Sequence, residues 1–473
     1  LVELGELPAQ RCRVARRRHS RDLDAGRRRV GGGRGRSQRI ARARWRCGCP
    51  RSGDRPFLRR RASPREPAGE RGRLGGRLQH GARARCRRRT TREGGHVTTP
   101  RVLFVARTRY ALPLSVTLQR RFDALSAVID WRQFATSSTG KGVSDERFTL
   151  VGRFPVARLD GAAFYSALPV RLAREIRAFR PEVLVVQGAE DTALALAGRR
   201  LARSNVPVVF DVHGDWRNNT RVYGSPGRRV LAPVADALAR LTLRHADAVR
   251  TVSGFTSELV REQGVEPTAT FPAYMDLAPF TATPPVALPT TPQALFVGVL
   301  ERYKAVDVLA DAWPSVCARV QGARLHVVGR GRLANTVEAL VTETSLGVSW
   351  TPELPTEGVA QALDESTLLV LPSRGEGMGR VLVEAFCRGR SIVGTDSGGI
   401  PDLVENGVSG FLVPPDDSDG LAAALTRVLG DPVLAQRLGS GAHAAAGRWV
   451  ATPEEFAGRM RALVDTVIER RRR

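Results

Sequence analysis

The chain has 473 residues, enough for two or three domains, and carries a formal net charge of +27. No apolar stretch approaches the ~20 residues of a membrane span, and the N-terminal part lacks the apolar centre of a signal peptide. The six cysteines show neither a disulfide framework nor a zinc-binding spacing, so we expect a cytoplasmic protein and leave open a peripheral contact with the inner face of the membrane.

Residues 1–96 carry most of the positive charge, with 30 arginines, no lysine and 8 acidic residues. High charge with few apolar residues predicts disorder. One interpretation is a mis-called upstream extension with the true start at Val97, because the first methionine of the chain is Met275 and arginine is used without lysine. The other is a genuine basic tail for nucleic acid or an acidic membrane. The first interpretation is favoured, and nucleic acid is therefore disfavoured as a partner.

The first lobe is predicted over residues 97–285, where short apolar segments alternate with amphipathic ones. Strands are expected at 101–106, 181–187 and 206–212, and a helix at 168–179. This alternation is typical of a parallel, doubly wound sheet.

A proline-rich segment, residues 280–293, predicts a linker, after which the same alternation restarts. The second lobe is predicted over residues 286–450, with strands at 294–298, 324–329, 368–371 and 391–394. A final helix is predicted within 451–473. Two Rossmann-like lobes of this kind bind ligands at the carboxyl ends of their strands, so a ligand site is expected in a cleft between them.

The segment from 372 to 416 contains the most informative motif. Glu376 and Glu384 stand eight positions apart, separated by a glycine-containing turn and the start of a helix. Glycines let backbone N–H groups approach an anion closely, and a helix N-terminus favours a diphosphate. Carboxylates accept hydrogen bonds from ribose and sugar hydroxyls. The motif therefore predicts a sugar-nucleotide site.

The order and spacing of these residues resemble the nucleotide-sugar domain of the family-4 retaining glycosyltransferases, which have the two-domain GT-B fold. The pattern continues to Asp416, with Ser391 in place of the usual proline and Asp402 in place of the usual glutamate. The resemblance implies an α/β GT-B fold whose C-terminal helix returns to the first lobe. It also implies transfer of a hexose from a nucleotide-diphosphate sugar to a glycan, lipid or small-molecule acceptor, with no metal and no cofactor besides the donor substrate.

The resemblance assigns roles to individual residues. His213 and Glu376 are the expected catalytic residues: His213 at a strand end would orient the donor sugar, and Glu376 would bind its hydroxyls. Lys304, one of only two lysines in the chain, would offset the diphosphate charge as a compact cation. The donor-binding residues are expected to be Gly298, Arg302, Lys304, Gly329, Gly377, Met378, Gly379 and Glu384.

The sequence departs from the family pattern in two places, one at the phosphate-binding position and one at the acceptor loop. Val299 stands where the family has a phosphate-binding arginine, and Ala305 replaces a glycine, so Arg302 becomes a candidate substitute for the missing cation. The usual glycine-rich acceptor loop is absent, and Arg107 and Arg109 are predicted to line an unusual site for an anionic acceptor. Solvated surface arginines are the equal alternative for those two residues.

Two other functions remain open beside the favoured transferase. One is a nucleotide-sugar epimerase or hydrolase on the same fold, which would need no acceptor. The other is a non-catalytic, degenerate transferase that acts as a binding module.

Overall fold

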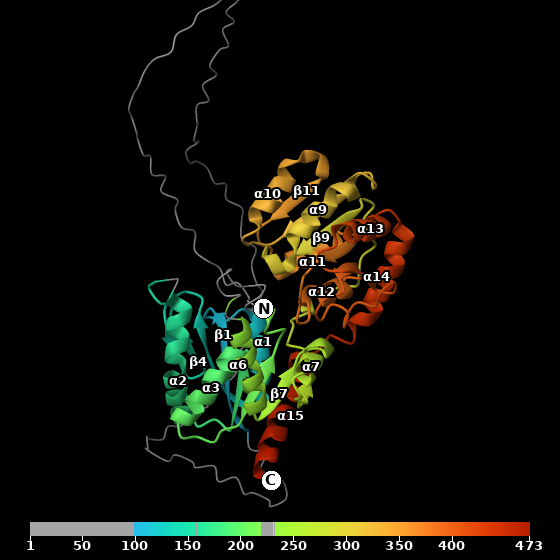
Figure 1. Cartoon of the computed structure of the whole chain (residues 1–473). Coiled ribbons are helices and arrows are strands. Elements are labelled where there is room, and N and C mark those ends of the chain that lie inside the picture. The colour runs from blue at the N-terminus through green and yellow to red at the C-terminus, as the bar shows by residue number, and fades with distance from the viewer. Residues whose placement is uncertain (1–98, 157–158, 219–229, 231) are drawn as a thin grey trace, which may run out of the picture. The chain divides into compact units, whose positions relative to one another are not determined.

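The computed structural model describes residues 99–156, 159–218, 230 and 232–473, all of which belong to one compact unit (Figure 1). The arginine-rich segment 1–96 lies outside the described residues, and so do both interpretations of it. Among the helices that are described, none combines the length and the apolarity needed to cross a membrane.

The first lobe is built on an eight-stranded sheet with the order β3-β4-β2-β1-β5-β6-β7-β8, in which only the β3–β4 pair is antiparallel. β1 lies between β2 and β5, so the strand order reverses there and a crevice opens at the carboxyl ends of β1 and β5. The strands are β1 (Arg101–Tyr110), β2 (Asp130–Ser137), β3 (Val143–Ser144), β4 (Phe148–Val151), β5 (Val183–Gln187), β6 (Val208–Val212), β7 (Ala248–Thr251) and β8 (Ala269–Thr270).

Helices cover both faces of this sheet because its central strands are apolar on both sides. Val102 and Phe104 pack into one buried cluster with Phe122, whereas Leu103 and Val105 pack into another with Leu168 on the opposite face. The helices of this lobe are α1 (Val116–Val128), α2 (Asp160–Phe179), α3 (Ala189–Leu201), α6 (Ala232–His245) and α7 (Gly254–Arg261).

The second lobe is built on a six-stranded, entirely parallel sheet with the order β11-β10-β9-β12-β13-β14. Its strands are β9 (Gln293–Val297), β10 (Arg324–Val328), β11 (Val348–Thr351), β12 (Leu368–Leu371), β13 (Ser391–Thr395) and β14 (Gly410–Val413). Its helices are α8 (Ala278–Thr281), η2 (Arg302–Lys304), α9 (Val306–Cys317), α10 (Ala334–Thr342), η3 (Thr344–Leu346), α11 (Thr356–Asp364), α12 (Arg380–Cys387), α13 (Ser418–Leu429) and α14 (Pro432–Ala446). The prediction of an α/β fold with two doubly wound lobes is confirmed.

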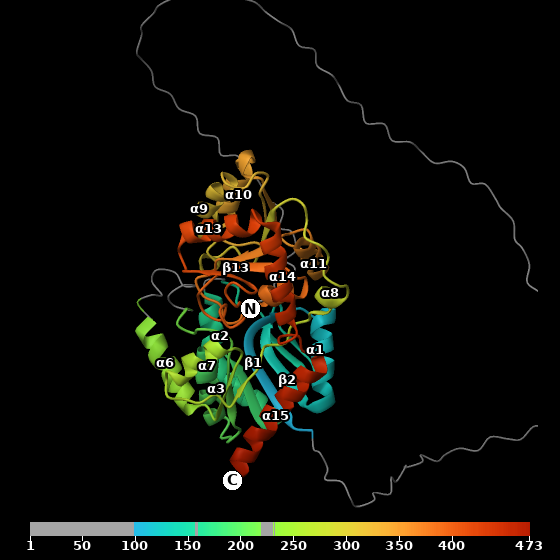
Figure 2. The ribbon, with the colours of Figure 1, turned by 90° about the vertical axis from the view of Figure 1, so that its right-hand side faces the viewer.

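The last helix, α15 (Pro453–Arg472), packs on the first lobe. Thr452 and Glu455 form a capping box at its start, which fixes where the helix begins. Phe456 and Leu463 are buried in the same cluster as Phe122 of α1, and Figure 2 shows α15 beside α1 and β2. A helix that follows the second lobe in the chain therefore completes the core of the first.

Two buried arginines hold the proline-rich linker against the second lobe. The side chain of Arg388 donates to the carbonyl of Thr283 at 2.7 Å and pairs with Asp364 at 2.6 Å. Arg390 donates to the carbonyl of Val286 at 3.0 Å. Both side chains are fully buried, so this linker is anchored to the second lobe and is not a free tether.

Candidate functional site

A cavity of about 610 Å³ lies between the carboxyl ends of the strands of the two lobes. Gln187, Asp211 and His213 reach it from β5, β6 and the loop that follows β6. The second lobe contributes residues that follow β9 and β12. The residues expected to bind the donor that line this cavity are Gly298, Lys304, Glu376, Gly377 and Glu384.

A buried ion pair lines the cavity on the side of the second lobe. The Nζ of Lys304 lies 2.6 Å from Oε1 of Glu376, and the hydroxyl of Ser373 donates to the same oxygen at 2.8 Å. Only 6% and 4% of the two charged side chains are exposed. Ala305, which replaces the family glycine, ends η2 in the left-handed conformation with φ of 51°, so the backbone turn after Lys304 forms without a glycine.

Glu384 lies about one turn into α12 and is also buried. Burial raises the pKa of this carboxyl, although Arg380 and Lys304 act in the opposite direction. Nη2 of Arg380 lies 3.6 Å from Oε1 of Glu384, one helical turn away. Burial of Glu384 therefore opposes its ionisation, and strongly perturbed carboxyl groups of this kind are common at ligand-binding sites.

The raised pKa of Glu384 predicts a pH-dependent gain in stability for Glu384→Gln. A raised carboxyl pKa means that the folded chain binds the proton more tightly than the unfolded chain does. Stability is therefore lost as the pH rises above about 4.3, the pKa of a glutamate in the unfolded chain. Glu384→Gln should therefore melt at a higher temperature than the unmutated protein at neutral and alkaline pH, and the difference should disappear in acid. Glu357→Gln, at an exposed position of α11, is the control and should show no such gain.

The glycines of the motif let backbone segments of the two lobes meet. A Cβ atom at Gly377 would overlap the carbonyl oxygen of His213, which belongs to the other lobe. The hydroxyl of Ser253 donates to the carbonyl of Gly377 at 2.9 Å, also across the cleft. Gly379 has a φ of 72° and starts α12, and Met378 is buried. This loop is therefore both the wall of the cavity and a contact between the lobes.

Gly329 supports the cavity from behind. It has a φ of 146°, and a Cβ atom there would overlap the carbonyl oxygen of Gly298, which lines the cavity. Only glycine adopts this conformation and allows the two backbones to approach so closely.

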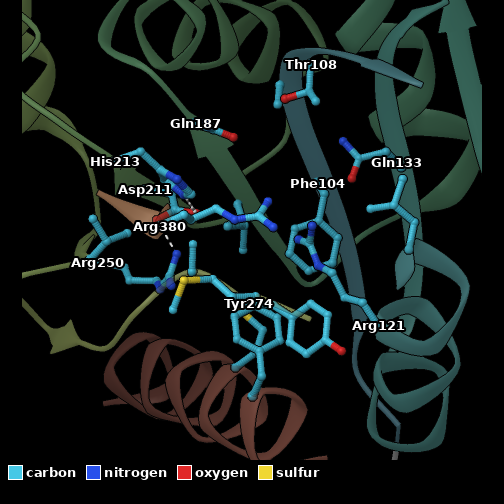
Figure 3. Close-up of a pocket in the computed structure, with 18 of the residues that line it drawn as sticks. Phe104, Thr108, Arg121, Gln133, Gln187, Asp211, His213, Arg250, Tyr274 and Arg380 are labelled. Atoms are coloured by element: carbon cyan, nitrogen blue, oxygen red, sulfur yellow. Dashed lines mark hydrogen bonds and ion pairs between the residues drawn. The ribbon is translucent and has the colours of Figure 1, made fainter. Parts of the chain in front are cut away.

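His213 belongs to a chain of buried charges in the first lobe (Figure 3). Its Nε2 lies 2.9 Å from Oδ2 of Asp211, whose Oδ1 accepts a hydrogen bond from Arg250 at 2.6 Å. Burial opposes ionisation of Asp211, but Arg250 and His213 outweigh it and hold the pKa of that carboxyl well below its usual range. Burial lowers the pKa of His213 in spite of Asp211. This shift favours the neutral imidazole, whose Nε2–H is directed at the carboxylate.

Arg302 does not fill the place of the missing cation at Val299. Val299 lines the cavity as expected, but the side chain of Arg302 is exposed, while its carbonyl accepts from the side chain of Arg374 and from the backbone N–H of Ala305. Arg380, at the start of α12, lines the cavity instead. The expectation for Arg302 is corrected for this reason: η2 turns its side chain outward while Lys304 points inward.

Arg107 and Arg109 do not line either cavity of the cleft. Both lie within β1, which extends to Tyr110, so their side chains share one face of the sheet and Thr108 has the other. Arg107 pairs with Asp160 at 3.4 Å, and Arg109 is exposed. Thr108 lines a second cavity. The expectation that Arg107 and Arg109 line a site in the cleft is therefore wrong for both side chains.

Several residues of the site were not anticipated from the sequence: Ser373, Arg121, Asp211, Arg250 and Arg380. Arg250 carried a usable signal, because an arginine inside the short apolar strand β7 needs a buried partner. Arg380 and Arg121 lie on helices where arginine is ordinary, so the sequence held no comparable signal for them.

Comparison with known proteins assigns the chain to a family. A model described as "Glycosyl transferase 4-like domain" matches residues 107–272, and one described as "Glycosyl transferases group 1" matches residues 291–431. One match falls on each lobe, and together they cover more than half of the chain. The chain belongs to the family-4-like glycosyltransferases of the GT-B fold.

Individual relatives agree with this family at modest identity. Glycogen synthase of Mycobacterium tuberculosis is 29% identical over 271 residues, which are 55% of this chain and 63% of that protein. Sucrose-phosphate synthase from Thermosynechococcus elongatus has a TM-score of 0.63 at 20% identity, over 78% of this glycosyltransferase and 100% of that chain. Anabaena HepE, solved in complex with UDP-glucose, has a TM-score of 0.56 at 18% identity, over 78% of this chain and 100% of that chain. The two solved structures support the fold.

The curated relatives are longer than the matched region. The chain spans 29%, 40% and 63% of the length of three of them.

Proposed function

We propose that this protein is a retaining transferase that moves a hexose from a nucleotide-diphosphate sugar to an acceptor hydroxyl. The observation that carries the proposal is the cavity between the lobes, where Lys304, Glu376 and Glu384 of one lobe face His213 of the other. All four side chains are buried or partly buried, and they are the residues to which the family resemblance gives donor roles.

In the proposed donor complex, each part of the nucleotide sugar meets a different group. Glu384 accepts hydrogen bonds from the ribose, and Glu376 with the backbone of 377–379 binds the sugar hydroxyls. Lys304 and the N-terminus of α12 offset the charge that develops on the diphosphate as it leaves. These fixed charges do the work that a divalent cation does elsewhere, so activity should survive a chelator.

The transfer itself is proposed to occur on one face of the sugar. The bond from the anomeric carbon to the diphosphate breaks, and the diphosphate oxygen keeps the electron pair. The acceptor oxygen bonds to the same face of that carbon, and its proton passes to the departing phosphate oxygen. Neutral His213 positions the sugar from the first lobe, and the contact between Gly377 and His213 excludes water from the reacting atoms.

The test is thermal stabilisation of residues 97–473 by UDP-, GDP- and ADP-linked hexoses, with Glu384→Ala measured alongside. UDP-glucose is the first donor to try, because a protein of the same fold has been solved with it. We expect one nucleotide to raise the melting temperature and Glu384→Ala to abolish the rise, while Glu357→Ala retains it. No rise with any donor would favour the non-catalytic binding module, and free or epimerised hexose formed without acceptor would favour the hydrolase or epimerase.

A further inference from the structure

A second cavity, of about 140 Å³, adjoins the donor cavity on the side of the first lobe (Figure 3). It is lined by the carboxyl ends of β1 and β5 together with residues of α1, α12 and α15. Gln187, Asp211, His213 and Arg380 line both cavities. A group bound in the second cavity would therefore lie next to the donor sugar, where an acceptor must be placed for transfer.

Three guanidinium groups line this cavity: those of Arg121, Arg250 and Arg380. In Figure 3, Arg121 and Arg380 extend toward each other from opposite sides of the cavity. Nε of Arg250 is buried and has no hydrogen-bond partner, and the same is true of Nε of Arg121. Because these two Nε atoms are enclosed by protein, a ligand in the cavity would meet the terminal nitrogens of the guanidinium groups, and those of Arg250 are already bonded to Asp211, Phe271 and Pro272.

The positive charge of Arg121 has no carboxylate partner among the described residues. Its guanidinium lies over the rings of Phe122 and Phe456, 5.3 and 5.5 Å from their centroids, which holds it in place without neutralising it. A guanidinium held in this way beside a cavity, without an ion pair to a carboxylate, is prepared for an anion.

The two acidic residues that line the cavity are already engaged. Asp211 binds Arg250 and His213, as described above. Asp276 accepts a hydrogen bond from the hydroxyl of Thr117 at 2.8 Å and lies 3.7 Å from Arg120. Arg380 also has a partner, since it lies 3.6 Å from Glu384, so the positive charge left without a carboxylate at this cavity is that of Arg121.

We propose that this cavity binds the acceptor through a phosphate ester held between Arg121 and Arg380. This proposal rests on the proposed transferase function and names the class of its acceptor. Guanidinium groups bind phosphate oxygens through paired hydrogen bonds, and two that converge from opposite sides suit a tetrahedral group with several oxygens. A cavity of about 140 Å³ is the size that holds a benzene ring, so the part of the acceptor inside it is limited to the phosphate and a few neighbouring carbon atoms. A soluble phosphate ester and a phospholipid headgroup share this chemistry.

The experiment compares acceptors that carry a phosphate with counterparts that lack it. The soluble pairs are glucose with glucose 6-phosphate and glycerol with glycerol 3-phosphate. The lipid pair is diacylglycerol with phosphatidylglycerol, each in phosphatidylcholine vesicles. With the donor that stabilises the protein, the phosphorylated member of at least one pair should have a kcat/KM at least about tenfold higher. The pair that responds distinguishes the soluble source from the lipid source, and equal rates for all pairs would overturn the proposal.

Variants of Arg121 separate this proposal from the donor site. Arg121→Gln should lower kcat/KM for the phosphorylated acceptor at least about tenfold, Arg121→Lys should restore part of it, and the Kd for the nucleotide should not change. Arg174→Gln removes an exposed arginine from α2 of the same lobe and should leave all rates unchanged. An Arg121→Gln variant that folds, binds nucleotide and keeps its preference for phosphate would refute the proposal.

A binding measurement keeps the two proposals independent. Titration of glycerol 3-phosphate, with glycerol as the neutral control, reports on the second cavity without any transfer. If it binds and Arg121→Gln abolishes binding, the anion site stands even where no donor is turned over. If hexose is transferred only to neutral acceptors and glycerol 3-phosphate does not bind, the transferase function stands and the anion site is wrong.

Discussion

Lys304→Met should destabilise the protein by about 3–5 kcal/mol, the range observed when one member of a buried ion pair is removed. The substitution keeps the apolar stem of the side chain but leaves the buried carboxylate of Glu376 with only the Ser373 hydroxyl as a side-chain donor. Urea denaturation measures the loss. Transfer should fall by a factor of about 10²–10³ as well, because the cation that we propose to face the diphosphate is gone.

The double variant Lys304→Met/Glu376→Gln tests the physical cause. Neutralising Glu376 removes the unpaired buried charge, so the double variant should regain much of the lost stability while transfer stays abolished. Lys141→Met is the matched control, because Lys141 is the other lysine of the chain and is exposed. A double variant no more stable than Lys304→Met would show that the ion pair does not account for the loss.

Gly377→Ala should reduce kcat/KM by about a hundredfold or more, since a displacement of about 1 Å of the reacting groups has an effect of this size. The new methyl group would overlap the carbonyl oxygen of His213, and backbone cannot move aside as a side chain can. Either the lobes separate or the loop 375–379 shifts. Nucleotide binding should suffer less than transfer, because Lys304 and Glu384 both belong to the second lobe.

Gly375→Ala, in the same loop, is the control for this prediction. A methyl group there would meet only the amide of the Asn218 side chain, which can rotate away, so the activity should fall by much less than in Gly377→Ala. Steady-state kinetics and the nucleotide Kd of both variants decide the matter. Equal activity in the two variants would mean that the close approach of the lobes at Gly377 is not required for transfer.

The sequence anticipated those strands and helices that a short stretch of regularly spaced apolar residues defines. The expected strands at 101–106, 206–212 and 294–298 correspond to β1, β6 and β9, and the helix expected at 168–179 lies within α2. The end of β1 was misjudged, because residues 107–110 are polar yet continue the strand beside β2. That extension alternates the side chains, which is why Arg107 and Arg109 leave the cleft and Thr108 enters it.

The donor side of the site could be read from the sequence because it is nearly contiguous. Glu376, Gly377 and Glu384 follow one strand and start one helix, so their spacing fixes their relative positions almost regardless of the rest of the chain. Lys304 was found through its rarity as one of two lysines and through the family resemblance. Local spacing could not place it, since it follows a different strand and meets Glu376 across 72 positions of sequence.

By itself, therefore, the sequence determined two α/β lobes and a segment with two glutamates, one in a loop and one in the helix that follows, because periodicity and short-range spacing encode them. Only the tertiary structure decided that Arg121, Arg250 and Arg380 converge on one cavity. These residues come from α1, β7 and α12, and no local pattern links them. The reversal of strand order at β1 and the closure of the two lobes bring them together, and both are properties of the folded chain.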